Sequence, residues 1–140
     1  MSSYTIHEVR TRPEVDSISA LTWATWYEPY MPSVRIAAPI SGYTAADRER
    51  TVVENKERMW NDYSNESTNK TWLCVKDEHD QIVGGLVCDF AEGSPFPNGC
   101  PKVDLYWWPE GEEVRDFCEE MMNQVYTPRS LWMQRPHGGE

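Results

Sequence analysis

The sequence predicts a single α+β domain in which helices pack on an antiparallel sheet. Apolar and polar residues alternate near the N-terminus, and two largely apolar stretches flank a charged turn within residues 72–90; both patterns are typical of strands. Three longer stretches instead carry apolar residues at helical spacing. A length of 140 residues is that of one domain, since single cores usually run ~100–200 residues. We expect one domain over residues 1–137 and a C-terminal tail at 138–140.

The first half of the chain predicts a strand followed by two helices. Residues 4–9 alternate in character, as a half-buried strand does. Pro13 suits the first turn of a helix, and the apolar spacing that follows continues to Tyr27, before Pro29. A second helix is expected over residues 44–63, because Thr44-Ala-Ala-Asp47 resembles a capping box. Residues 28–43, rich in proline and apolar side chains, read as a long loop of the kind that often binds ligands.

The second half predicts a β-hairpin, an irregular segment and a helix. The hairpin strands are expected at residues 72–75 and 81–90, with Gly84-Gly85 marking a bulge or a close backbone approach. Residues 91–109 are rich in glycine and proline and read as irregular. The apolar residues of 114–125 then fit a helix, and residues 130–133 are expected to be briefly extended. The order is β-α-α-β-β-loop-α, and an antiparallel sheet covered by helices is the simplest fold for it.

The charge balance excludes some classes of partner. Thirteen basic and 23 acidic residues give a net charge of −10, which argues against nucleic acid and against anionic membranes. Residues 77–120 hold twelve of the carboxylates and only Lys102 and Arg115 as cations. This acidic region is either a solvated surface or a means of attracting a cationic or amine substrate.

The chain shows no export signal and no membrane span, so a cytoplasmic protein is expected. The N-terminus lacks a basic and apolar signal sequence, and no apolar run approaches the ~20 residues of a transmembrane helix. Four cysteines at positions 74, 88, 100 and 118 include no Cys-x-x-Cys pair. We therefore expect reduced thiols and no metal site.

Four short stretches carry a resemblance to a known family. They are Ile6-His-Glu-Val-Arg10, Gln81-Ile-Val-Gly-Gly85, Trp108-Pro-Glu-Gly111 and Arg135-Pro-His137. Together with the element order they resemble the N-terminal part of a GNAT-family N-acetyltransferase of the fungal type. The resemblance spans nearly the whole chain and implies an acyltransferase-related protein.

The resemblance also implies what the chain lacks. In the family, the central strand and the helix after it bind acetyl-CoA through backbone N–H groups at the helix N-terminus. This sequence ends at Gly138-Gly139-Glu140, where that strand should begin. We therefore expect no cofactor, with acetyl-CoA used only if the missing half is supplied elsewhere.

A missing central strand predicts an open sheet edge. In the family the strand at 81–90 pairs with the central strand, so here its backbone N–H and C=O groups would lack partners. A homodimer joined along this edge is the least costly remedy. The seven tryptophans suit such an interface, and they suit a ligand pocket equally well.

Candidate substrate-binding residues come from two aromatic groups. In GNAT-like proteins the amine substrate lies near the loop between the first two helices, which implies Trp26, Tyr27, Tyr30 and Met31. Tyr106 and Trp107, beside Asp104, form a second aromatic block that could floor an apolar pocket. The alternative for both groups is that the rings fill a core or an interface.

Candidate catalytic residues are Asp89, Glu92 and His7. The two carboxylates follow the second hairpin strand, where a general base could act if burial raised its pKa. His7 lies on the first strand, and histidine is the side chain best matched to proton transfer near neutral pH. The alternatives are a solvated acidic loop end and a structural histidine.

Three functions remain open from the sequence. The first is a GNAT-like protein that binds a small organic molecule as a dimer and performs acid–base chemistry without a cofactor. The second is the N-terminal fragment of an acetyl-CoA-dependent N-acetyltransferase. The third is a non-enzymatic module that captures another protein on its exposed strand.

Overall fold

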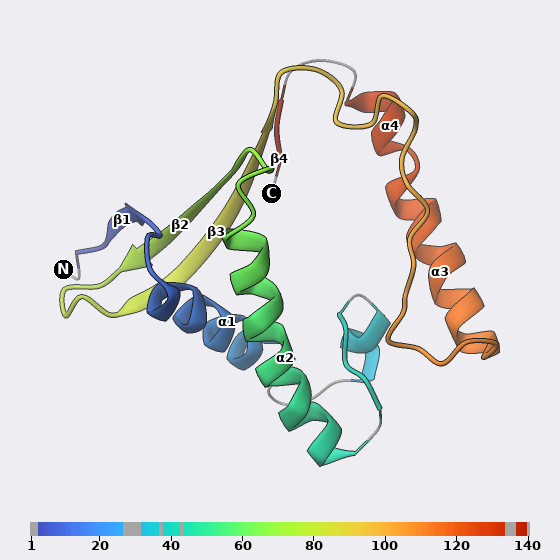
Figure 1. The fold of residues 1–140 in the computed structure, drawn as a ribbon, viewed down its shortest axis with the longest axis horizontal. Helices are drawn as coiled ribbons and strands as arrows, with labels where there is room; N and C mark the ends of the chain where they lie inside the picture. Colours follow the sequence, from blue (N-terminus) through green and yellow to red (C-terminus); the bar gives the residue numbers. More distant parts are fainter. Residues whose placement is uncertain (1–2, 27–31, 37, 43, 134–136, 140) are drawn as a thin grey trace. The chain divides into compact units, whose positions relative to one another are not determined.

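The chain combines an antiparallel sheet with helices, which confirms the α+β class (Figure 1). The computed structural model describes residues 3–26, 32–36, 38–42, 44–133 and 137–139. The elements in chain order are β1 (Thr5–Glu8), α1 (Arg12–Trp26), the 3-10 helix η1 (Pro32–Ile36), α2 (Ala45–Tyr63), β2 (Lys70–Lys76), β3 (Ile82–Ala91), α3 (Glu113–Tyr126), α4 (Arg129–Trp132) and β4 (His137–Gly139).

The contacts of the chain divide it into two compact units. Unit 1 falls within residues 1–30, 52–90 and 138–140, and unit 2 within residues 31–51 and 91–137. Unit 1 therefore contains the sheet, α1 and most of α2, whereas unit 2 contains η1, α3 and α4. The segment expected to form one domain at 1–137 thus includes two compact parts.

The sheet of unit 1 has the strand order β1-β2-β3-β4. β1 and β3 both pair antiparallel with β2, so that His7 and Gly85 lie opposite Cys74 from either side. The register shifts between Val75 and Lys76, where β3 accommodates one additional residue. Residues 138–139, expected as a tail, belong instead to the short strand β4 beside β3.

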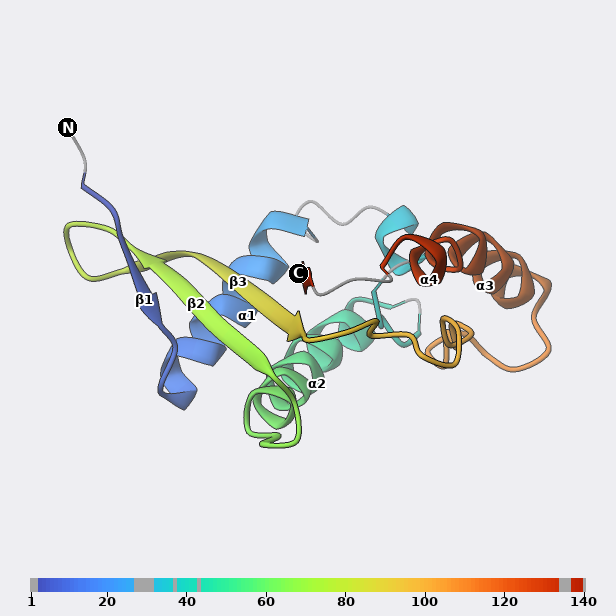
Figure 2. The ribbon, with the colours of Figure 1, turned by 90° about the horizontal axis from the view of Figure 1, so that it is seen from above.

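The core of unit 1 lies between the sheet and helices α1 and α2, which cover the same face of the sheet (Figure 2). Its fully buried members are Val9, Val15, Ile18, Trp72 and Cys74. Val15 and Ile18 stand about one helical turn apart on α1, and Trp72 and Cys74 stand two residues apart on β2. Each pair therefore lies on one face of its element, and the two faces meet in the same apolar layer. Burial stabilises the fold by ~1.5–3 kcal/mol for each large apolar side chain.

At Gly85 the sheet lies very close to α1. A Cβ atom at this position would lie 2.7 Å from Cγ2 and 2.8 Å from Cγ1 of Ile18. The expectation of a close backbone approach at Gly84-Gly85 is confirmed at its second residue. At Gly84 an added Cβ would meet Val75 at an ordinary 3.6 Å.

The start of α2 is a reciprocal cap between Thr44 and Asp47. The Thr44 hydroxyl accepts a hydrogen bond from the Asp47 backbone N–H at 3.1 Å, and Oδ2 of Asp47 accepts the Thr44 backbone N–H at 3.0 Å. Hydrogen bonds from the Thr44 backbone and hydroxyl, followed by the bond from Arg50, lower the pKa of Asp47 from 3.8 to about 2. The capping box expected from the sequence is confirmed.

This cap predicts a defined dependence on pH. Because the pKa of Asp47 is lower in the folded chain than in the unfolded one, its contribution is fully present above pH 3.8 and is lost as the pH falls toward about 2. Titration of side-chain carboxyl signals by NMR should place the Asp47 midpoint near 2, and Asp47→Asn should flatten the acid limb of the stability curve. A midpoint near 4, the usual value for aspartate, would contradict the cap.

Unit 2 is organised around a buried arginine. Arg35 is only 2% exposed, and its Nε donates to the carbonyl of Ile40 at 2.8 Å. Its guanidinium carbon lies 3.9 Å from the ring centroid of Trp108, a cation–π distance. The indole N–H of Trp107 donates to the carbonyl of Arg35 at 2.7 Å. These contacts join η1 to the segment before α3. The apolar core of the unit is formed by Leu105 and Trp108 from this segment and by Cys118 from α3.

Side chains of α3 bind the backbone of the segment at 103–105. Asn123 Oδ1 accepts the N–H of Val103 at 2.8 Å, and Glu119 Oε1 accepts the N–H of Leu105 at 3.0 Å. The bond from Arg115, together with that from Leu105, lowers the pKa of Glu119. The segment is therefore fixed without strand pairing, because its backbone donors find side-chain acceptors.

Two expectations about the C-terminal helix region differ from the structure. Residues 129–132 form the short helix α4, not an extended segment, because Pro128 is helical and its carbonyl accepts the N–H groups of Leu131 and Trp132. The helix at 114–125 is confirmed, but Phe117 and Val125 are exposed, while Cys118 is buried. The inner side of α3 instead uses Arg115 and Glu119.

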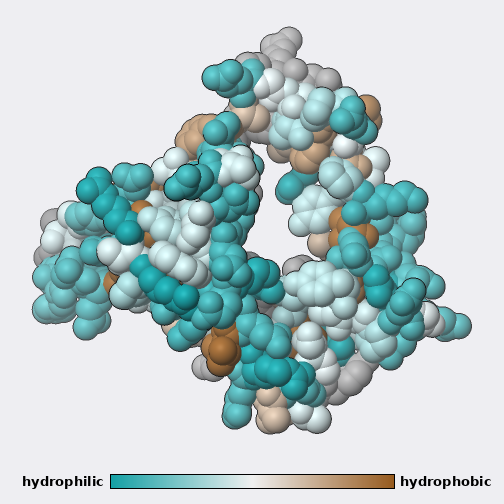
Figure 3. Space-filling model, viewed as in Figure 1, coloured by the Kyte–Doolittle hydropathy of each residue, from teal (hydrophilic) through white to brown (hydrophobic). Residues whose placement is uncertain are grey.

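Among the residues that the structure describes, no helix is both long and apolar enough to cross a bilayer. The face seen in Figure 3 is mostly hydrophilic, with apolar groups in separate patches.

Candidate functional site

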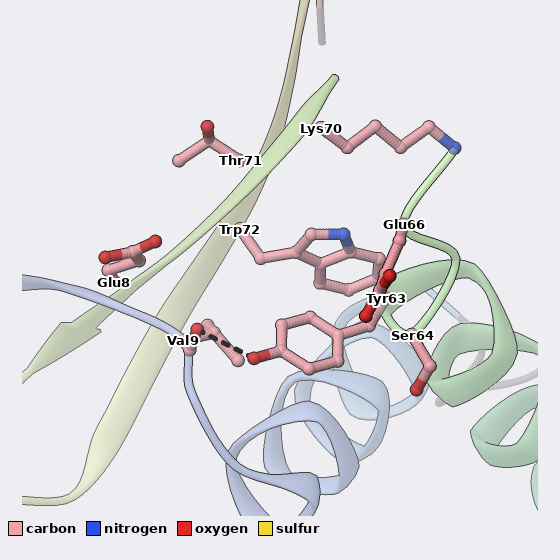
Figure 4. A pocket seen from close by; sticks show the side chains of 8 residues that line it. All are labelled: Glu8, Val9, Tyr63, Ser64, Glu66, Lys70, Thr71 and Trp72. Carbon is pink, nitrogen blue, oxygen red and sulfur yellow. Dashed lines mark hydrogen bonds between the residues drawn. The ribbon is translucent and has the colours of Figure 1, made fainter. Parts of the chain in front are cut away.

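A pocket opens in unit 1 where the start of β2 passes the end of α2 (Figure 4). Its volume is about 370 Å³, within the range of ~300–1,000 Å³ typical of small-molecule sites. The lining residues are Glu8, Val9, Tyr63, Ser64, Glu66, Lys70, Thr71 and Trp72. β1, β2, α2 and the loop at 64–69 therefore all contribute to it.

Trp72 forms the inner wall of the pocket. The side chain is 5% exposed and belongs to the apolar core, since even-numbered residues of β2 face the helices. The Tyr63 ring meets it edge-on, with the centroids 6.0 Å apart and the planes at 87°. The Tyr63 hydroxyl donates to the carbonyl of Val9 at 3.2 Å, which ties α2 to the end of β1.

The indole N–H of Trp72 is buried and has no hydrogen-bond acceptor among the described residues. An indole nitrogen can only donate, and a buried donor without a partner costs ~1–3 kcal/mol. In Figure 4 the nitrogen lies on the side of the ring nearest Lys70 and Glu66, away from Glu8 and Val9. Trp72, which lines the pocket, thus carries an unused donor.

The outer rim of the pocket is a tight polar loop. Asn65 Oδ1 accepts hydrogen bonds from the backbone N–H of Ser67 at 3.1 Å and from its hydroxyl at 2.6 Å. The carbonyl of Asn65 accepts the N–H of Thr68 at 3.2 Å. Glu66 stands exposed within this turn. The loop conformation is set by Asn65, which leaves the Glu66 carboxylate available at the rim.

Lys70 brings a positive charge to the same rim. Its Nζ lies 2.6 Å from Oδ1 of Asp62, and the two side chains are 27% and 37% exposed. An ion pair this exposed contributes little to stability, ~0–1 kcal/mol. Its main consequence is to hold the ammonium group beside the pocket.

The candidate residues expected from the sequence in unit 1 do not gather at one site. His7 on β1 is exposed, and its Nε2 lies 2.8 Å from the hydroxyl of Thr5. Asp89 on β3 is exposed opposite Lys70, whereas His7 lies opposite Cys74, four positions further along β2. Trp26 ends α1 and is 65% exposed. Tyr27, Tyr30 and Met31 lie outside the described residues.

The candidates in unit 2 have different surroundings. Tyr106 is exposed, and its ring contacts the Trp107 ring edge-on at 5.2 Å. Trp107 is half-buried, packs against the Leu105 cluster and donates to Arg35, so it acts as a structural anchor. Glu92 lies exposed just beyond β3.

Sequence reasoning missed the pocket residues Trp72, Tyr63, Lys70 and Glu66. Trp72 was expected only as part of a strand, because a short apolar strand pattern does not tell a core tryptophan from one that also lines a pocket. The sequence feature that could have indicated the pocket is the polar stretch from Ser64 to Lys70, which lies between the aromatic residues Tyr63 and Trp72. A turn between aromatic anchors positions polar groups at the edge of a core.

Metal or thiol chemistry finds no support at this site. Within the residues that the structure describes, no cluster of three or more histidine, cysteine or acidic side chains is arranged to hold a metal ion. Burial raises the pKa of the Cys74 thiol, so this cysteine is a poor nucleophile. The site offers hydrogen bonds and charges for binding.

Comparison with known proteins returned no family model, no curated protein and no solved structure that matches this chain.

Proposed function

We propose that this chain is a small-molecule-binding protein and that its ligand occupies the Trp72 pocket. The observation that carries the proposal is a buried indole N–H without an acceptor in the described residues, next to a cavity of about 370 Å³. Buried donors in folded proteins nearly always have a partner. The proposal is for binding alone, since His7 and Asp89 lie apart on the sheet.

The proposed framework is GNAT-like. In support, the chain follows the order strand, two helices and antiparallel hairpin, and His137–Gly139 forms a strand next to β3. The resemblance implies a central strand at this place. Acetyl-CoA is therefore included among the compounds to be tested, and its binding by the chain would favour the alternative of an N-acetyltransferase fragment.

The indole signal of Trp72 gives a direct test. In protein labelled with ¹⁵N-tryptophan, Trp72→Phe identifies this signal by its disappearance while keeping an aromatic ring in the core. We expect at least one compound class among amino acids, amines, carboxylates, sugars, nucleosides and acetyl-CoA to shift the Trp72 signal and leave Trp26, at the exposed end of α1, unchanged. If millimolar amounts of every class leave the Trp72 signal in place, the proposal is wrong.

A second candidate function, self-association into a homodimer, is favoured by the outer face of the sheet. Ile6 is 72% and Phe90 55% exposed, and Leu86 lies beside them on the face away from α1 and α2. Among the described residues only β4, of three residues, neighbours the ten-residue β3 on its outer side. An apolar face bordering a long strand edge fits a second copy of the chain.

Sedimentation equilibrium tests the homodimer. The chain should sediment with twice its 16.3 kDa mass, and Phe90→Lys should convert it to a monomer by placing a charge in the apolar contact. Val53→Lys, at a 63% exposed site on α2, is the matched control and should leave the dimer intact. A monomeric wild-type chain at high micromolar concentration would exclude this candidate.

A further inference from the structure

The chemistry of the Trp72 pocket limits the class of ligand that it could hold. The first constraint is the donor at its inner wall. Trp72 is only 5% exposed, and its indole N–H finds no acceptor among the described residues. A ligand placed there gains most from an oxygen atom that accepts this hydrogen bond.

The second constraint is the cation beside that donor. Lys70 lines the same pocket, and an ammonium group has three donor hydrogens, of which the bond to Asp62 uses one. Figure 4 shows the Lys70 side chain running along the edge of the pocket on the side of the indole nitrogen. A carboxylate has two acceptor oxygens, one for each of these donors.

The third constraint is negative charge at the rim. Glu66 is exposed and lines the pocket, and Asp62 stands beside Lys70, so the rim carries two carboxylates and one cation. The register places Glu8 opposite Leu73, on the outer face of the sheet, so its charge lies on the other side of β2. A simple anion would be repelled by this rim, whereas a ligand that also carries an ammonium group would be attracted to Glu66.

We propose that the Trp72 pocket binds a free α-amino acid. Its carboxylate accepts hydrogen bonds from the Trp72 indole and the Lys70 ammonium group, and its own ammonium group faces Glu66. The rings of Tyr63 and Trp72 provide an apolar wall for the side chain. This inference rests on the proposed function, because it names the ligand class for the same pocket.

The test uses three compounds with one carbon skeleton. L-Leucine carries both charged groups, 3-methylbutylamine lacks the carboxylate, and 4-methylpentanoate lacks the ammonium group. Glycine and L-phenylalanine bracket the size of the side chain. We expect at least one of the amino acids to shift the Trp72 indole signal saturably, and we expect the leucine analogues to bind at least about tenfold more weakly than leucine, as loss of a charge-assisted hydrogen bond predicts.

Variants of the full chain assign the contacts. Trp72→Phe and Lys70→Met should each weaken amino-acid binding about tenfold, measured by calorimetry. Glu66→Gln should weaken the amino acid but not 4-methylpentanoate, which has no ammonium group to lose. Lys102→Met and Glu78→Gln are the matched controls, since both residues are exposed and neither lines the pocket, and they should change nothing.

The outcomes separate the ligand class from the pocket itself. If another class of compound shifts the Trp72 signal and no amino acid does, the ligand class is wrong and the proposed function stands. If no compound shifts the Trp72 signal, both fail. Equal binding of leucine and its two analogues would also overturn the inference.

Discussion

Replacing Arg35 with methionine is expected to destabilise unit 2 by about 3 kcal/mol. The change removes the hydrogen bond to the carbonyl of Ile40 at 2.8 Å and the stacking on Trp108 at 3.9 Å. Hydrogen bonds from charged groups contribute ~1.5–3 kcal/mol, and buried cation–π contacts up to ~2 kcal/mol. Methionine fills a similar volume, so the loss reflects chemistry more than a cavity.

Urea unfolding followed by circular dichroism measures this loss. Hydrogen exchange then locates it, since the Trp108 amide, bonded to the carbonyl of Leu105 at 2.9 Å, should exchange faster in the variant. Lys102→Met removes a charge from an exposed position of the same unit and should change the unfolding free energy by less than ~0.5 kcal/mol. Similar unfolding curves for the two variants would show that Arg35 does not organise this unit.

The second large effect is expected at Gly85, where alanine should destabilise unit 1 by ~1–3 kcal/mol, the usual cost of overpacking a core. The added methyl group would stand 2.7 Å from Cγ2 of Ile18, which is buried and branched at Cβ and so cannot turn away freely. Either the sheet or α1 must move to relieve the contact.

The adjacent glycine provides the control. Gly84→Ala places its methyl group 3.6 Å from Val75, an ordinary contact, and should be neutral or slightly stabilising. A double mutant that combines Ile18→Ala with Gly85→Ala should be less destabilised than the sum of the single changes, because the clashing atoms are gone. Equal stability of the two alanine variants would mean that α1 does not press on the sheet at Gly85.

Most elements of this fold follow from the sequence because they depend on local patterns. The hairpin was predictable from the two largely apolar stretches at 72–75 and 81–90 on either side of a charged turn, and α2 from the Thr44–Asp47 cap. α4 was not, because its four residues contain only Leu131 and Trp132 as apolar groups, both exposed. A single helical turn has no periodicity to detect.

The candidate site was much less predictable than the fold. Trp72 has the pattern of an ordinary strand residue, and only three-dimensional packing leaves its N–H without an acceptor in the described part of the chain. Glu66 lines the pocket from the turn that Asn65 stabilises, and Lys70 lines it from the first position of β2. Trp107 was expected to bind a ligand because it lies in an aromatic block, yet its indole N–H already donates to the carbonyl of Arg35. Aromatic content indicates where binding is feasible, but hydrogen-bond partners decide it.

The pairing of β1 with β2 has a consequence for biosynthesis. Thr5 at the start of the chain lies opposite Lys76, whereas β2 and β3 join through a short turn. The hairpin can close as soon as it leaves the ribosome, but β1 must wait until β2 has been translated. During that interval Val15 and Ile18 on α1 have no sheet to cover them. The nascent chain then exposes an apolar helix face, the kind of surface that holdase chaperones bind.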